Sequence, residues 1–130
     1  MKKSIFTLLF VAIGGMTMFA AQPKIWLLGD GTMAGWGKAF AEQVGATVEV
    51  KNIAQDGLSM KVLDEMGGLD SVIVDKTKKD FLLVQLGPND LKETNLDTYS
   101  SLHDFTQKLV ALLHAAEKKK MMVILCTPLA

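Results

Sequence analysis

The sequence contains no arginine, and its 130 residues include a single cysteine, Cys126. Without arginine the chain has no planar guanidinium group that could bind a phosphate or carboxylate in bidentate geometry. Its lysines are scattered, whereas a nucleic-acid-binding protein normally presents a clustered basic face, so nucleic-acid binding is disfavoured. One cysteine excludes an intrachain disulfide. The apolar neighbours of Cys126 indicate a small buried residue rather than a reactive thiol.

The N-terminal residues have the pattern of a secretory signal peptide. Lys2 and Lys3 give a positive start, residues 5–19 form an apolar stretch, and the small residues at 20 and 21 offer a cleavage site. We therefore expect a signal peptide over 1–21 and a mature domain over 22–130, secreted or periplasmic and without stable membrane association. A retained membrane anchor is the alternative, although the stretch is short for a span of about 20 residues.

The mature chain predicts one α/β domain. With residues 1–21 removed, 12 basic and 14 acidic side chains give a net charge of −2. Apolar runs that end in glycine or alternate in polarity predict strands, and apolar residues at helical spacing predict helices between them. The expected strands are 24–29, 47–54, 80–87 and 121–128, and the expected helices are 35–44, 60–66 and a long one that ends near 118. This alternation predicts a three-layer, doubly wound, flavodoxin-like parallel sheet.

The long helix carries the clearest apolar stripe. Asp97 or Thr98 can cap its N-terminus, and three lysines at 118–120 suit the dipole at its C-terminus. His103 and His114 lie inside this helix, where we expect ordinary solvated or packed side chains rather than catalytic ones. The stripe consists of Leu102, Phe105, Leu109, Leu112, Leu113 and Ala116.

Three glycine-bearing loops follow the expected strands, at 29–31, 56–57 and 87–90. Because the carboxyl ends of parallel strands lie at one edge of the sheet, these loops should gather where such folds bind ligands. The P-loop and dinucleotide-binding glycine patterns are both absent from the sequence. No clustered set of histidine, cysteine or carboxylate residues suggests a metal, so we expect neither metal nor cofactor. An unrelated flavodoxin-like protein, in which these glycines only form tight turns, is the alternative.

In their order and spacing, the three loops resemble the motif blocks of the SGNH or GDSL-type hydrolases, in particular the rhamnogalacturonan acetylesterase-like branch. That branch begins with a Gly-Asp-Ser-Thr-Met-Ala block, to which "GDGTMA" at 29–34 is similar. Its second block, Asn-x-Ala-x-x-Gly, is matched by Asn52, Ala54 and Gly57, and its third, Gly-x-Asn-Asp, by residues 87–90. The resemblance extends over residues 24–130.

The resemblance implies an esterase that removes acetyl groups from an acetylated polysaccharide or oligosaccharide. It assigns the oxyanion-binding donors to the Gly31 N–H, the Gly57 N–H and the side-chain amide of Asn89. Asp30 and Asp90 take supporting roles, with Asp90 expected to hold its loop rather than to touch substrate.

Two departures from the family pattern predict that this chain is inactive. Gly31 stands where the family has its nucleophilic serine, and Thr32 is only a weak alternative nucleophile because a shift of one residue redirects the side chain. The family's Asp-x-x-His pair lies beyond the region that the sequence matches, so we expect a domain truncated at its C-terminus.

Two other interpretations of such a chain stay open. One is a non-catalytic carbohydrate-binding pseudoenzyme in which Trp26 and Trp36 stack on sugars, although a tryptophan in an apolar strand, such as Trp26, is more typical of a core. The other is an unstable gene fragment. The sequence specifies neither the glycan nor the oligomeric state.

Overall fold

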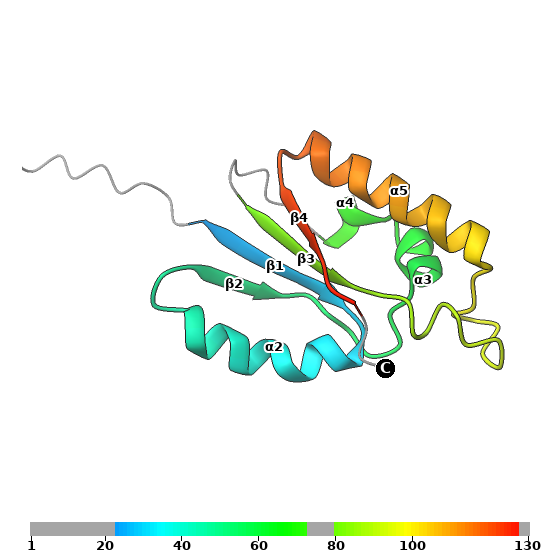
Figure 1. The fold of residues 1–130 in the computed structure, drawn as a ribbon, viewed down its shortest axis with the longest axis horizontal. Helices are drawn as coiled ribbons and strands as arrows, with labels where there is room; N and C mark the ends of the chain where they lie inside the picture. The colour runs from blue at the N-terminus through cyan, green and yellow to red at the C-terminus, as the bar shows by residue number, and fades with distance from the viewer. Residues whose placement is uncertain (1–22, 73–79, 128–130) are drawn as a thin grey trace, which may run out of the picture.

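The computed structural model describes residues 23–72 and 80–127, and the expected signal peptide lies outside these ranges. Within them, the chain forms a four-stranded parallel sheet in the order β2-β1-β3-β4 (Figure 1). The strands are β1 (Lys24–Gly29), β2 (Glu49–Asn52), β3 (Phe81–Gln85) and β4 (Met122–Leu125); the helices are α2 (Gly31–Val44), α3 (Met60–Glu65), α4 (Leu69–Val72) and α5 (Leu102–Lys118). The expected doubly wound α/β class is confirmed.

The two central strands, β1 and β3, are the most buried part of the sheet. They pair in parallel from Ile25 opposite Phe81 to Gly29 opposite Gln85, and β1 is buried from Trp26 to its end. The outer strands β2 and β4 are shorter than their apolar patterns predict. Beyond the end of β2 the chain still bonds to β1, since the Ile53 N–H donates to the Leu27 carbonyl at 3.0 Å. The Asn52 side chain accepts a hydrogen bond from the Ala54 N–H in the same stretch.

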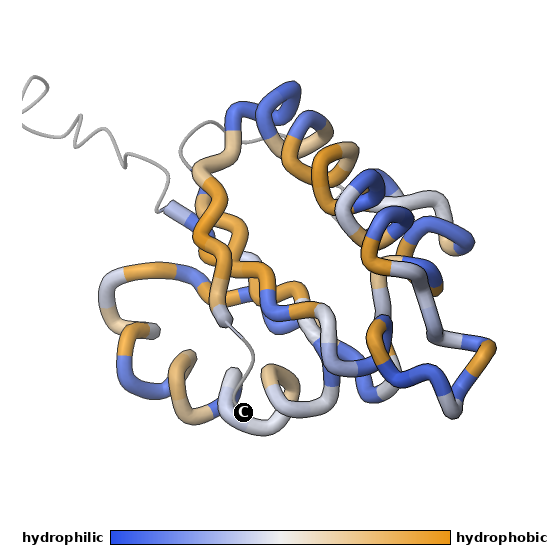
Figure 2. Tube along the Cα trace, turned by 45° about the vertical axis from the view of Figure 1, so that its right-hand side comes forward, coloured by the Kyte–Doolittle hydropathy of each residue, from blue (hydrophilic) through white to orange (hydrophobic). Residues whose placement is uncertain are grey.

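Helices cover the sheet on two sides. Helix α2 packs on β1 and β2, whereas α3, α4 and α5 pack together on the other side (Figure 1). Between the latter helices and the sheet lies the hydrophobic core, which includes Trp26, Leu28, Leu82, Leu112 and Ala116. The hydropathy colouring of Figure 2 shows this arrangement, with apolar strands inside and mixed helices around them.

Helix α2 begins at Gly31, four residues before the expected start at 35. The buried carboxylate of Asp30 causes this early start, because its Oδ1 accepts a hydrogen bond from the Thr32 N–H at 2.9 Å and so caps the helix. The glycine-rich first turn is therefore helical. For the short helix α3, the expected cap is confirmed, since Ser59 accepts from the Val62 N–H at 3.1 Å.

Helix α5 begins later than expected, at Leu102 with Ser101 as its cap, so a start at Asp97 or Thr98 was wrong. The residues before Ser101 are held instead by tertiary hydrogen bonds: the Thr98 hydroxyl donates to the Asn89 carbonyl at 3.0 Å, and the Ser100 N–H donates to the Asp90 carbonyl at 2.7 Å. Leu102 does not join the apolar stripe, because its side chain is 70% exposed.

Strand β4 has an exposed surface. Met122, Ile124 and Leu125 are all among the exposed large apolar residues, and no other described strand pairs with the outer edge of β4. Cys126 follows this strand and is half-buried, with its N–H donating to the Val84 carbonyl at 2.8 Å. A C-terminal truncation of the domain stays a prediction. No helix in the described part of the chain has the length and apolar character needed to cross a membrane.

Candidate active site at the carboxyl ends of the strands

The three glycine-bearing loops meet beside the carboxyl ends of β1, β2 and β3. The Gln55 N–H donates to the Gly29 carbonyl at 3.0 Å, which fixes the loop after β2 against the end of β1. The Asn89 side chain donates through Nδ2 to the Leu58 carbonyl at 3.0 Å, which fixes the loop after β3 against the loop after β2. We call Gly31, Asp56, Gly57, Leu58 and Asn89 the loop junction.

Asp56 fills the space beside Gly31. A Cβ atom built on Gly31 would lie 2.6 Å from Asp56 Oδ1, closer than real Cβ atoms approach another atom, and 3.3 Å from Asp56 Cγ, which is a tight contact. The carboxylate therefore lies directly against the position from which a side chain at residue 31 would begin. The role of Asp56 was not predicted from the sequence, because the pattern between Ala54 and Gly57 does not show which residue of another loop a side chain will contact.

Two backbone N–H groups of the loop junction have no acceptor among the described residues. As the first residue of α2, Gly31 has no partner for its N–H within the helix. Among residues 23–72 and 80–127, no carbonyl or side chain accepts from the N–H of Gly31 or of Gly57. Gly57 has φ +74, a left-handed conformation that glycine adopts readily. Both donors are therefore available to a ligand.

One hydrogen of the Asn89 side-chain amide has no acceptor among the described residues. Its amide nitrogen carries two hydrogens, and one of them bonds the Leu58 carbonyl. Gly57 lies between Asp56, which approaches Gly31, and Leu58, which accepts from Asn89. The three residues expected to donate to an oxyanion therefore all belong to the loop junction. Their role as an oxyanion hole stays a prediction.

Asp90 is fully buried beneath the loop junction. Its Oδ1 accepts from the Met60 N–H at 2.7 Å, and its Oδ2 has no hydrogen-bond partner among the described groups. Burial raises the pKa of the Asp90 carboxyl above its ordinary value, and the backbone N–H of Met60 opposes that shift. Asp90 therefore lies where it links the third loop to the start of α3 rather than where it would meet a ligand.

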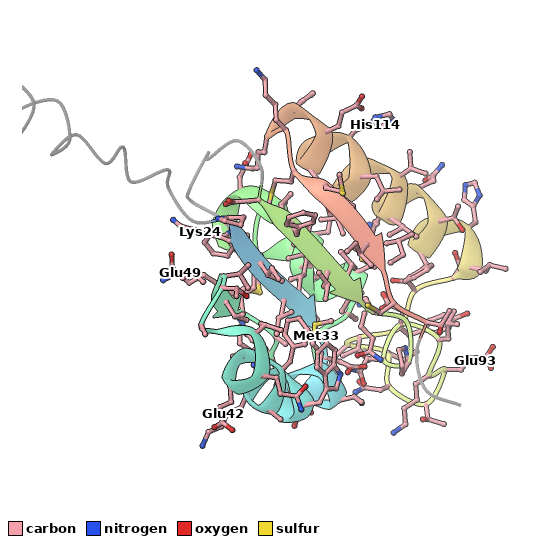
Figure 3. The ribbon with its side chains drawn as sticks, turned by 60° about the vertical axis from the view of Figure 1, so that its left-hand side comes forward. Lys24, Met33, Glu42, Glu49, Glu93 and His114 are labelled. Carbon is pink, nitrogen blue, oxygen red and sulfur yellow. The ribbon has the colours of Figure 1, made fainter. Side chains whose placement is uncertain are left out.

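The remaining candidate side chains are either exposed or hydrogen-bonded to groups outside the loop junction. Thr32 is exposed in the first turn of α2. His103 and His114 are both exposed on α5, and Figure 3 shows His114 on the outer side of that helix. Trp26 is buried in the core, and Trp36 donates to Gln85 Oε1 at 3.1 Å while its ring meets Phe40 edge to face. No described set of histidine, cysteine and carboxylate residues could hold a metal ion.

A cavity of about 150 Å³ lies away from the loop junction, between α3, α4 and α5. Its lining is largely apolar and includes Met60, Leu63, Leu69 and Leu112. Asp64 and Lys108 form an ion pair at this cavity. The cavity is therefore a small apolar gap between helices with charged residues at its rim.

Comparison with known proteins identifies relatives of the chain. No family model matches the sequence. Rhamnogalacturonan acetylesterase RhgT of Bacillus subtilis (strain 168) is 34% identical over 92 residues, which cover 63% of this chain and 40% of RhgT. The probable rhamnogalacturonan acetylesterase YesY of the same organism is 28% identical over 113 residues, which cover 85% of this chain and 52% of YesY. The chain thus spans about half the length of these curated relatives or less.

Solved structures share the fold. The acetyl xylan esterase AlAXEase superposes with a TM-score of 0.67 at 21% identity, over 81% of this chain and 58% of that protein. By its sequence relatives and its fold, the chain is therefore similar to SGNH-type hydrolases. The resemblance to the rhamnogalacturonan acetylesterase-like branch, drawn from three short blocks, is confirmed.

Proposed function

We propose that the chain is an exported, esterase-like protein of the SGNH type, related to acetylesterases of plant cell-wall polysaccharides and unable by itself to hydrolyse acetyl esters. Its relatives by sequence are named for acetylated rhamnogalacturonan, which supports an acetylated polysaccharide or oligosaccharide as the related substrate. Secretion or transport to the periplasm rests on the signal-peptide pattern of residues 1–21.

One observation carries the proposed inactivity. The position from which a nucleophile would attack is Gly31, which has no side chain, and the space beside it holds the Asp56 carboxylate. Acyl transfer through a covalent intermediate needs a hydroxyl or thiol beside a base. The unused N–H groups of Gly31 and Gly57 could stabilise an oxyanion, but they supply no nucleophile.

The direct test is hydrolysis of p-nitrophenyl acetate and of acetylated rhamnogalacturonan by residues 22–130. We expect no release above the uncatalysed rate, and no change on replacing Thr32 with alanine or, as a matched control, Thr106 on α5. Turnover by the parent protein that Thr32→Ala abolishes and Thr106→Ala leaves intact would show that Thr32 is the nucleophile and that the proposed inactivity is wrong.

A second candidate is a non-catalytic carbohydrate-binding protein. The observation that favours it is the pair of unused backbone donors at the loop junction, which needs no nucleophile in order to bind a ligand. Binding of an oligosaccharide without its hydrolysis would support this candidate. Rapid proteolysis of the purified domain would instead favour an unstable gene fragment.

A further inference from the structure

Asp56 changes the chemistry of the loop junction from that of an ester-binding site. Its carboxylate is exposed and accepts no hydrogen bond from any described group, while its Oδ1 lies 2.6 Å from where a Gly31 Cβ would be. An ionised carboxylate has only acceptor positions. The loop junction therefore offers a strong, unused acceptor beside its unused donors.

An acetyl ester fits this set of groups poorly. The ester has no hydrogen to donate, so neither of its oxygens can bond the Asp56 carboxylate. The tetrahedral oxyanion formed during hydrolysis would also carry negative charge close to Asp56, and like charges at short range repel. In this chain the Asp56 carboxylate therefore destabilises the tetrahedral oxyanion that the backbone N–H groups would stabilise.

A free hydroxyl group matches the donors and the acceptor of the loop junction. A hydroxyl can donate to the Asp56 carboxylate and accept from the N–H of Gly31 or Gly57 at the same time. Two neighbouring hydroxyls of one sugar ring can each use one of the two carboxylate oxygens. Hydrogen bonds with an ionised acceptor are roughly twice as strong as neutral ones, so Asp56 would dominate the choice of ligand.

We propose that Asp56 makes the loop junction a binding site for the free hydroxyl groups of a deacetylated saccharide, in preference to its acetyl esters. This inference rests on the proposed relation to carbohydrate acetylesterases and identifies the chemical form of the ligand. Asp56 acts in it as the residue that determines specificity, and no bond of the saccharide is broken.

The experiment compares two forms of one ligand. Rhamnogalacturonan oligosaccharides, either acetylated or deacetylated with alkali, are titrated into ¹⁵N-labelled protein, and the amide signals of Gly31 and Gly57 report binding. We expect the deacetylated form to bind about tenfold more tightly, the difference expected from one charge-assisted hydrogen bond. The shifts should be largest at these two amides.

Two variants remove the Asp56 carboxylate from the loop junction by different means. Asp56→Asn removes its charge, whereas Gly31→Ala places a methyl group against Oδ1 and turns the intact carboxylate away. Both variants should bring the affinity ratio of the two forms close to one. Glu42→Gln is the matched control, because Glu42 is an exposed carboxylate of α2 that points to solvent (Figure 3), and it should leave the ratio unchanged.

The outcomes separate this inference from the proposed function. Equal binding of both forms, or preference for the acetylated form, would overturn the role of Asp56 while leaving the relation to carbohydrate intact. A preference for the deacetylated form that survives both Asp56→Asn and Gly31→Ala would also overturn it. No shift with either form would overturn this inference together with the carbohydrate-binding candidate.

Discussion

Replacing Asp90 should change how the stability of the domain depends on pH. Because burial raises the folded-state pKa of Asp90 above its ordinary value of 3.8, the folded protein holds this proton more tightly than the unfolded chain. The resulting stabilisation is complete below the unfolded-state pKa and is lost as the pH rises through the folded-state pKa. Asp90→Asn keeps an oxygen for the Met60 N–H but cannot ionise, so this loss should disappear.

The size of the effect follows from proton linkage. The stability of the parent relative to Asp90→Asn should fall by at most about 1.4 kcal/mol per pH unit, starting near pH 4. Asp90→Ala should cost about 1–3 kcal/mol near pH 4, because the Met60 N–H, now 2.7 Å from Oδ1, loses its acceptor inside the protein. For a domain of this size, such a loss lowers the Tm by several degrees per kcal/mol.

The assay is urea unfolding from pH 3.5 to 8, with Asp97→Asn as the control. Asp97 is an exposed carboxylate of the same loop, so its replacement should leave the pH profile parallel to that of the parent. If the Asp90→Asn profile is also parallel to that of the parent, Asp90 is not the buried, proton-holding group described above.

Two further predictions concern export and the core. The mature N-terminus should lie near Gln22, as N-terminal sequencing of secreted material will show, and secreted protein that still begins at Met1 would contradict signal cleavage. Asp80→Ala should cost about 2–3 kcal/mol in urea unfolding, because the buried Asp80 carboxylate accepts from Trp26 Nε1 at 3.0 Å and the indole would lose its partner. An unchanged midpoint would show that this hydrogen bond contributes nothing.

Local patterns were enough to predict the sheet and its loops. The apolar strands ending at Gly29 and near Gly87 need only their own residues to be recognised, and the parallel order then follows from the intervening helices. The cap at Ser59 was predictable for the same reason, since it bonds to Val62 three residues away. The start of β2 was placed too early because the N–H groups of Thr47 and Val48 both donate to the Val44 carbonyl, in the turn that follows α2.

Features set by contacts between distant segments could not be predicted. The start of α5 depends on Ser100 bonding to the Asp90 carbonyl, a contact that outcompetes the caps available at Asp97 and Thr98. The placement of Asp56 against Gly31 joins residues 25 positions apart, and only the folded chain shows it. The short helix α4 was missed because Leu69–Val72 is too brief to show a helical period.

The central claim, that Gly31 leaves an SGNH-type site without its nucleophile, is tested most directly by a four-way comparison of ester hydrolysis. The proteins are the parent, Gly31→Ser, the parent extended by the C-terminal segment of RhgT, and both changes together. We predict background rates for the first three, and a gain of several powers of ten for the fourth once the introduced hydroxyl side chain has turned the Asp56 carboxylate aside. Turnover by the parent equal to that of the doubly changed protein would contradict the claim.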